Sequence, residues 1–140
     1  MARLKKHVSL KLTTAQNDAF WDVVEDIGWC DAARRKVRRK GSVSAAQQEA
    51  NALSRDAREA MREIAWDKVG AMQRRYYEWC ERHDIDPGVI RLGDDNFSDL
   101  VYHVVGCGRS VYAENMRNPG LLFRRAKSGD FEESFGYLFL

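Results

Sequence analysis

The sequence predicts a mainly α protein: a compact, single-domain helical bundle of four to five helices with a minor two-stranded β element from the chain ends. Its 140 residues are the length of one domain, with a helical core expected over 13–140. Hydrophobic residues make up 44% of the chain, and six Phe, five Tyr and four Trp supply enough apolar bulk for a core. Along most of the chain apolar residues recur every three or four positions, which is the period of a helix that buries one face.

The two ends of the chain carry the strand signal. In residues 7–12 polar side chains alternate with Val8, Leu10 and Leu12, as in a half-buried strand. The closing segment FEESFGYLFL repeats this alternation at Phe135, Tyr137 and Phe139. We expect the two segments to pair and to tie the chain ends together.

A first helix is expected directly after residue 12. Thr13 or Thr14 can cap its start, and Gly28 is placed to end it. Between them runs an apolar stripe: Phe20, Trp21, Val23, Val24 and Ile27.

A long helical stretch is expected from a cap at Ser42 or Ser44 to about His83. No apolar residue stands at position 68, so a break or bend near Gly70 fits the pattern. The stripe that predicts the stretch has intervals of three and four: Leu53, Ala57, Met61, Ile64, Ala65, Met72, Tyr76, Trp79 and Cys80.

After a loop that ends near residue 95, a helix is expected with Asn96 as its cap and Asp99 completing a capping-box-like start. Gly106 and Gly108 lie inside this helix, where glycine usually permits close approach of another segment. The pair at 118–119, Asn-Pro, predicts a stop and a restart into a short helix to about residue 127. The apolar stripe is Phe97, Leu100, Val101, Val104, Val105, Val111 and Tyr112.

Positive charge is concentrated in the first third of the chain. Residues 1–41 carry ten Lys or Arg against five Asp or Glu, whereas 42–140 carry 13 against 16. The segment 30–41 is expected to be a basic connection between helices. A basic run can bind phosphates without sequence preference, although no aromatic residue is interleaved with it, and a solvated loop is the alternative. The residues concerned are Arg34, Arg35, Lys36, Arg38, Arg39 and Lys40.

Two Cys/His pairs have spacings that place both side chains on one helix face. Cys80 and His83 are three residues apart, and His103 and Cys107 are four apart. Two thiolates and two imidazoles would suit zinc, so zinc is the one cofactor that the sequence suggests. The alternative is a core role, because Cys80 continues an apolar stripe and free cysteine is often buried.

No established catalytic motif is present, so no catalytic residue is assigned. A Cys107 nucleophile would need a base, and His103 is one helical turn away. Three sparsely spaced cysteines predict a reduced chain rather than a disulfide framework. With no signal-peptide pattern and no apolar run of membrane-spanning length, we expect a cytoplasmic protein without a membrane partner.

Several short pieces resemble an uncharacterised bacterial family, the domain of unknown function 4240. The pieces are AFWDVVEDI near the start, YEWC at 77–80, DDNFSDL at 94–100, GRSVYAENMRNPGLL at 108–122 and ESFGYLF at 133–139. The chain departs from the family where DIDPGVIRLG replaces a Gly-rich stretch, and the basic run looks like an addition. The resemblance implies a compact helical domain without an established activity. The positions it points to are Trp21, Asp94, Asp95, Phe97, Asp99 and Arg109.

These observations favour a non-catalytic domain that binds another macromolecule, most simply a protein, as an inhibitor, immunity-type factor or regulator. Exposed aromatics are frequent at such interfaces, and Tyr77 is the aromatic expected to be exposed, with Tyr76 and Trp79 facing the core. One alternative is nonspecific nucleic-acid binding through residues 34–40. A second is a zinc- or cysteine-dependent enzyme.

Overall fold

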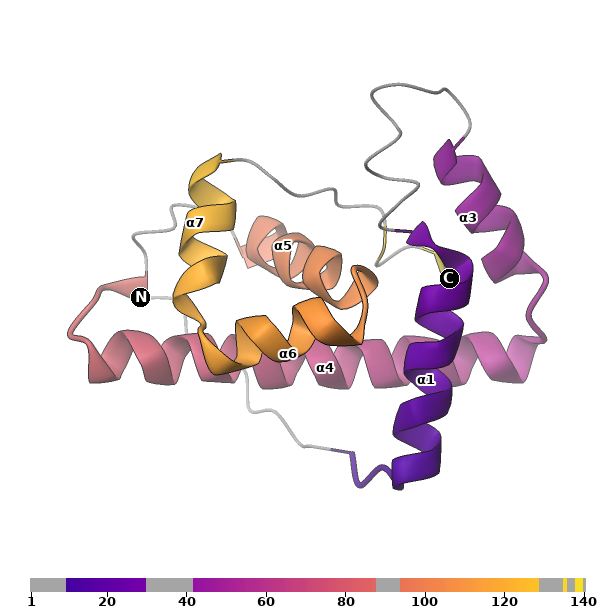
Figure 1. Cartoon of the computed structure of the whole chain (residues 1–140), viewed down its shortest axis with the longest axis horizontal. Coiled ribbons are helices and arrows are strands. Elements are labelled where there is room, and N and C mark those ends of the chain that lie inside the picture. Colours follow the sequence, from indigo (N-terminus) through magenta and orange to yellow (C-terminus); the bar gives the residue numbers. More distant parts are fainter. Residues whose placement is uncertain (1–9, 30–41, 88–93, 129–134, 136–137, 140) are drawn as a thin grey trace.

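The computed structural model describes residues 10–29, 42–87, 94–128, 135, 138 and 139, with the side chains of 42–45, 94–96 and 128 excepted. Within these ranges the protein is mainly helical, as predicted (Figure 1). No helix in the described part combines the length and hydropathy that crossing a membrane requires. The helices are α1 (Thr14–Ile27), α3 (Ser42–Asn51), α4 (Arg55–Arg82), α5 (Asp94–Gly106), α6 (Arg109–Arg117) and α7 (Gly120–Ser128).

The long helix α4 is the element on which α5, α6 and α7 assemble, and α3 contacts α1 (Figure 1). Helix α1 crosses the N-terminal half of α4, α6 runs along its middle and α7 rises from its C-terminal half (Figure 1). Helix α5 makes the most extensive contact with α4. One stripe of α4 is buried in the core: Met61, Ala65, Val69, Met72, Tyr76 and Cys80.

The expectation of one helix over 42–83 is wrong at residues 52–54. Ser54 is extended (φ −61°, ψ 160°) and its hydroxyl accepts a hydrogen bond from the Ala57 amide at 3.1 Å. This cap satisfies an amide at the start of α4, so the chain begins a new helix there. No break occurs at Gly70, where α4 is continuous and Val69 keeps the stripe buried.

Helix α1 has the boundaries that the sequence predicts. The Thr13 hydroxyl accepts from the Gln16 amide at 3.1 Å, and the Gln16 side chain accepts from the Thr13 amide at 2.9 Å. This capping box fixes the start of the helix. Gly28 ends it with φ 64°, a left-handed conformation that glycine adopts without steric cost.

The helix expected across 97–112 is two helices. Gly108 has φ 103° and separates α5 from α6, because a backbone at that angle cannot continue a helix. Gly106 provides the close approach that the sequence suggests: a Cβ there would lie 2.6 Å from side-chain atoms of Phe135 and Trp29. The helix also begins three residues before Phe97, the first helical residue expected, since α5 begins at Asp94 and contains Asn96 instead of being capped by it.

The two-stranded element is not supported. Residues 10–12 have no regular structure, and the Leu10 amide donates to a carboxylate oxygen of Asp67 at 2.9 Å. At the other end Phe135, Leu138 and Phe139 are all buried, and the Leu138 amide donates to the Phe135 carbonyl at 3.1 Å. Inward side chains at intervals of three and four fit a turn rather than a strand. Residues 7–9 and Tyr137 lie outside the described part.

The restart at Asn118-Pro119 is confirmed. The Asn118 carbonyl accepts from the Leu121 amide at 3.1 Å, and the Pro119 carbonyl accepts from the Leu122 amide at 3.0 Å. These bonds form the first turn of α7, and Leu122 fixes that helix to the core.

Candidate functional site

Lys68 lies at the junction of α1, α4 and α6. Its ammonium donates a hydrogen bond to the Asn17 side chain and lies 5.5 Å from the ring centre of Trp21 and 5.8 Å from that of Tyr112. Burial lowers the pKa of Lys68, the Asp67 carboxylate opposes this shift, and the Arg109 guanidinium adds to it. The position that looked like a gap in the stripe is therefore occupied by a lysine whose ammonium lies over two aromatic rings.

Arg109 and Asp18 join α6 to α1. Their charged atoms are 2.7 Å apart and both side chains are about half exposed. An exposed pair of this kind contributes about 0–1 kcal/mol to stability. Arg109 is thus engaged with its own chain and helps to fix the helices around Lys68.

Of the other positions to which the resemblance points, two lie in the core. Trp21 and Phe97 are buried, and the Phe97 ring is 5.2 Å from that of Tyr76. Asp99 is half-buried, and Asp94 and Asp95 begin α5, where their side chains lie outside the described part. Trp21 and Phe97 therefore have an evident packing role in this fold.

The structure brings one Cys/His pair into contact and leaves the other apart. The Cys107 sulfur is 3.5 Å from Nε2 of His103, and His103 packs edge-on against Trp29 at 5.1 Å. Cys80 is fully buried, and burial raises the pKa of its thiol. His83 is exposed at the end of α4.

The four Cys and His residues do not form one site. Over the described ranges, no three His, Cys, Asp or Glu side chains are grouped closely enough to hold a metal ion. The zinc-binding set of two thiolates and two imidazoles is accordingly not assembled in this arrangement. Residues 34–40, which carry the sequence-based nucleic-acid prediction, lie outside the described part.

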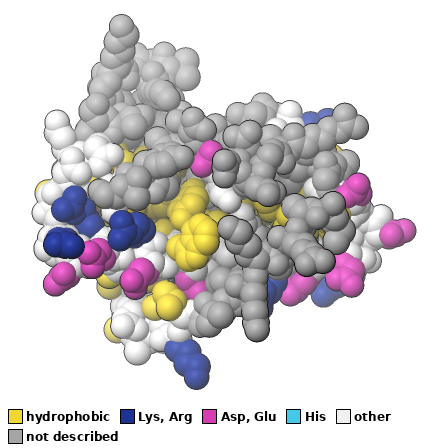
Figure 2. Space-filling model, turned by 180° about the vertical axis from the view of Figure 1, so that it is seen from behind, with side chains coloured by type: hydrophobic (Ala, Val, Ile, Leu, Met, Phe, Trp, Pro, Cys, Tyr) yellow, Lys and Arg dark blue, Asp and Glu magenta, His cyan; other side chains and the backbone are white. Residues whose placement is uncertain are grey.

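The exposed aromatic of α4 is Trp66, not Tyr77. Trp66 is 57% exposed, whereas Tyr77 is partly buried against the core. Arg62 and Glu63, one turn before it, are also exposed. Hydrophobic side chains are visible beside charged ones on the face shown in Figure 2. The sequence did contain a signal for Trp66, because it stands off the stripe that predicts the buried face of α4.

Comparison of the chain with models of protein families gave no match. Comparisons with curated proteins and with solved structures gave no match either. The resemblance to the domain of unknown function 4240 stays a prediction.

Proposed function

We propose that the chain is a non-catalytic protein-binding domain of the inhibitor, immunity or regulator type, with Trp66 at the centre of the contact. The observation that carries this proposal is the 57% exposure of Trp66. Trp21 and Trp29 are buried, and Trp79 is packed against the core. Burying the Trp66 ring against a partner would remove a large apolar area from water, and tryptophan is enriched among the residues that dominate binding energy.

The setting of Trp66 supports an interface. It projects from a 28-residue helix whose opposite side is held by the core, so little conformational freedom is lost when a partner packs on it. The exposed charges of Arg62 and Glu63 supply a polar rim around an apolar centre. Inhibitors and regulators need such a surface and no catalytic group.

The test is capture of partners at high salt from an extract of the cells that produce the protein, using wild type and Trp66→Ala. The wild type is expected to retain a defined partner that the variant loses, because burial of an apolar ring is insensitive to salt. The free energy of unfolding of the variant should lie within about 0.5 kcal/mol of the wild-type value, because the Trp66 side chain is exposed.

Leu10→Ala is the matched control, because Leu10 is the other large hydrophobic residue with high exposure in the described part, at 44%. It is expected to keep the partner. Equal retention by wild type and Trp66→Ala would contradict the proposal.

A further inference from the structure

Positive charge is concentrated in the last two helices of the described part. Residues 109–128 contain five Arg or Lys residues and a single acidic residue, Glu114. Arg117, Arg124 and Lys127 are exposed. This excess lies within the part of the chain that is acidic overall, so the count over 42–140 conceals it.

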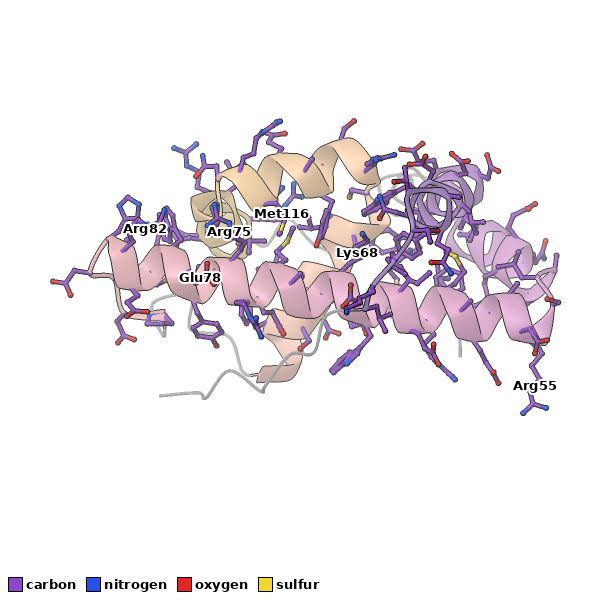
Figure 3. The ribbon with its side chains drawn as sticks, turned by 90° about the horizontal axis from the view of Figure 1, so that it is seen from below. Arg55, Lys68, Arg75, Glu78, Arg82 and Met116 are labelled. Atoms are coloured by element: carbon purple, nitrogen blue, oxygen red, sulfur yellow. The ribbon has the colours of Figure 1, made fainter. Side chains whose placement is uncertain are left out.

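Helix α4 adds two arginines to the same region. Arg75 and Arg82 are seven residues apart and therefore share one face of the helix. Nε of Arg75 donates to the carbonyl of Met116 at 3.0 Å, which places this face against the end of α6. In Figure 3 both arginines lie at the α7 end of α4, whereas Arg55 lies at the other end.

Trp79 connects these arginines to α7. A Cβ on Gly120 would lie 2.9 Å from the Trp79 ring, so the ring rests on the first turn of α7. Arg124 and Lys127 follow Gly120 by four and seven residues and share its face. The α4–α7 basic surface thus consists of Arg75, Arg82, Arg117, Arg124 and Lys127 around Trp79.

The carboxylate that pairs with Arg75 lies at the border of this surface. Glu78 is 3.9 Å from Arg75 and half exposed. From the helical repeat, Glu78 is about 60° round α4 from Arg75 on one side, and Trp79 is about 40° round on the other. The side of α4 that meets α7 therefore keeps its positive charge.

Aromatic rings accompany the charges. The His83 ring is exposed and lies 5.0 Å from the Trp79 ring at a tilt of 41°. On α7, the Lys127 ammonium lies 5.8 Å from the centre of the Phe123 ring. Cations that can bind successive phosphates, interleaved with rings on which bases can stack, are the features of a single-strand binding surface.

We propose that the α4–α7 basic surface binds single-stranded nucleic acid, with its cations on the phosphates and the His83 ring under a base. The surface is separate from Trp66, which precedes Arg75 by nine residues and lies about 180° round α4 from it. It is also separate in sequence from the basic run at 34–40.

The test is a fluorescence-anisotropy titration of a labelled single-stranded oligonucleotide at several salt concentrations. The test variant is Arg117→Gln/Arg124→Gln/Lys127→Gln, and the control variant is Lys11→Gln/Arg55→Gln/Arg62→Gln, which removes equal charge at exposed positions elsewhere. The test variant should bind about tenfold or more weakly at low salt. Its slope of log affinity against log salt should be smaller by about two, at roughly 0.7 per lost phosphate contact. The control should stay within about twofold of wild type.

His83→Ala tests the stacking part of the proposal. It should weaken single-strand binding by about fivefold or more and change duplex binding little, because paired bases cannot stack on an exposed ring. Polyglutamate of matched charge is added as a competitor and should displace the oligonucleotide poorly.

Four results would overturn the proposal: no wild-type binding at low salt, unchanged binding by the test variant, equal weakening of the test and control variants, or equal effectiveness of polyglutamate. Unchanged binding by the test variant would direct attention to residues 34–40, which are intact in all three variants. If His83→Ala binds both the single strand and the duplex as tightly as wild type does, the proposal that the ligand is single-stranded is overturned.

Discussion

At the scale of single residues, Cys80 and Cys107 differ in environment, because Cys80 lies on the buried face of α4 and Cys107 lies in the turn that follows α5. Cys80 is fully buried in the stripe of α4, whereas Cys107 is half-buried with its sulfur 3.5 Å from Nε2 of His103. The thiolate is the reactive form of cysteine, and burial disfavours it while a neighbouring imidazole can accept the proton. The cysteine environments thus give a direct probe of the native packing.

We expect iodoacetamide to alkylate Cys107 well before Cys80 in the folded protein, as measured by mass spectrometry of peptides after timed quenching. His103→Gln should slow the reaction at Cys107 because the proton acceptor is lost. In denaturant both thiols should react at similar rates, which is the control. Equal native rates for the two thiols would contradict the packing of α4.

Lys68 shows what residue patterns leave open. By sequence it interrupts an apolar stripe, yet in the structure its ammonium lies 5.5 Å from the centre of the Trp21 ring and donates to the Asn17 side chain. A long side chain with a charged end can lie on either kind of surface. The positions of α1 and α6 decide on which kind of surface the Lys68 side chain lies.

At the scale of elements, the junction of α5 and α6 depends on Gly106. An alanine inside an otherwise uncrowded helix is more stable than glycine by about 1 kcal/mol. Here a Cβ would meet Trp29 and Phe135 at 2.6 Å, and overpacking a core costs about 1–3 kcal/mol. Gly106→Ala is therefore expected to lower the free energy of unfolding, as measured by urea denaturation. A variant as stable as wild type, or more stable, would show that Gly106 does not lie this close to Trp29 and Phe135.

Local signals predicted some element boundaries well and others poorly. Thr13 and Gly28 bound α1 as expected, because a capping box and a left-handed glycine act within a few residues of the chain. The breaks at Ser54 and Gly108 were missed, because the apolar period continues across both and masks them. A stripe reports which residues are buried, and two helices in sequence can share one stripe.

At the scale of the whole molecule, three tyrosines connect stability to alkaline pH. Burial raises the pKa of Tyr102 to about 12, with the Asp99 carboxylate adding to the shift. Burial also raises the pKa of Tyr76 and of Tyr112 above the ordinary value. These groups lie on α4, α5 and α6, so their ionisation affects the entire core.

Below pH 10 the three tyrosines should make their full contribution to the free energy of unfolding. That contribution should be lost as pH rises from 10 towards 12. In that window the unfolded chain loses phenolic protons that the folded chain keeps, so deprotonation favours unfolding. The lowered pKa of Lys68 changes the free energy of unfolding in the opposite direction, because the buried ammonium loses its proton, and with it the cost of burial, as pH approaches 10.5. Lys68 is a single group, whereas the opposing effect comes from three tyrosines.

Urea unfolding at pH 9, 10 and 11.5 measures this dependence, and Tyr102→Phe should show a shallower decline. Unfolding that is independent of pH over this range would contradict the burial of the three rings.

The candidate surfaces follow the same division between local and distant information. The exposure of Trp66 was within reach of the sequence, since Trp66 stands off the α4 stripe. The α4–α7 basic surface was not, because Arg75 and Arg124 are 49 residues apart and are related through the packing of Trp79 on Gly120 and of Arg75 on Met116.

By itself the sequence determined the helical class, the extent of α1 and the restart before α7, since caps, glycines and apolar period act over a few residues. Tertiary structure alone decided that Phe135, Leu138 and Phe139 are buried, that the described Cys and His residues form no single metal site, and which charges lie on the α4–α7 basic surface. These outcomes depend on how α4, α5, α6 and α7 pack, and packing joins residues whose separation along the chain carries no local signal.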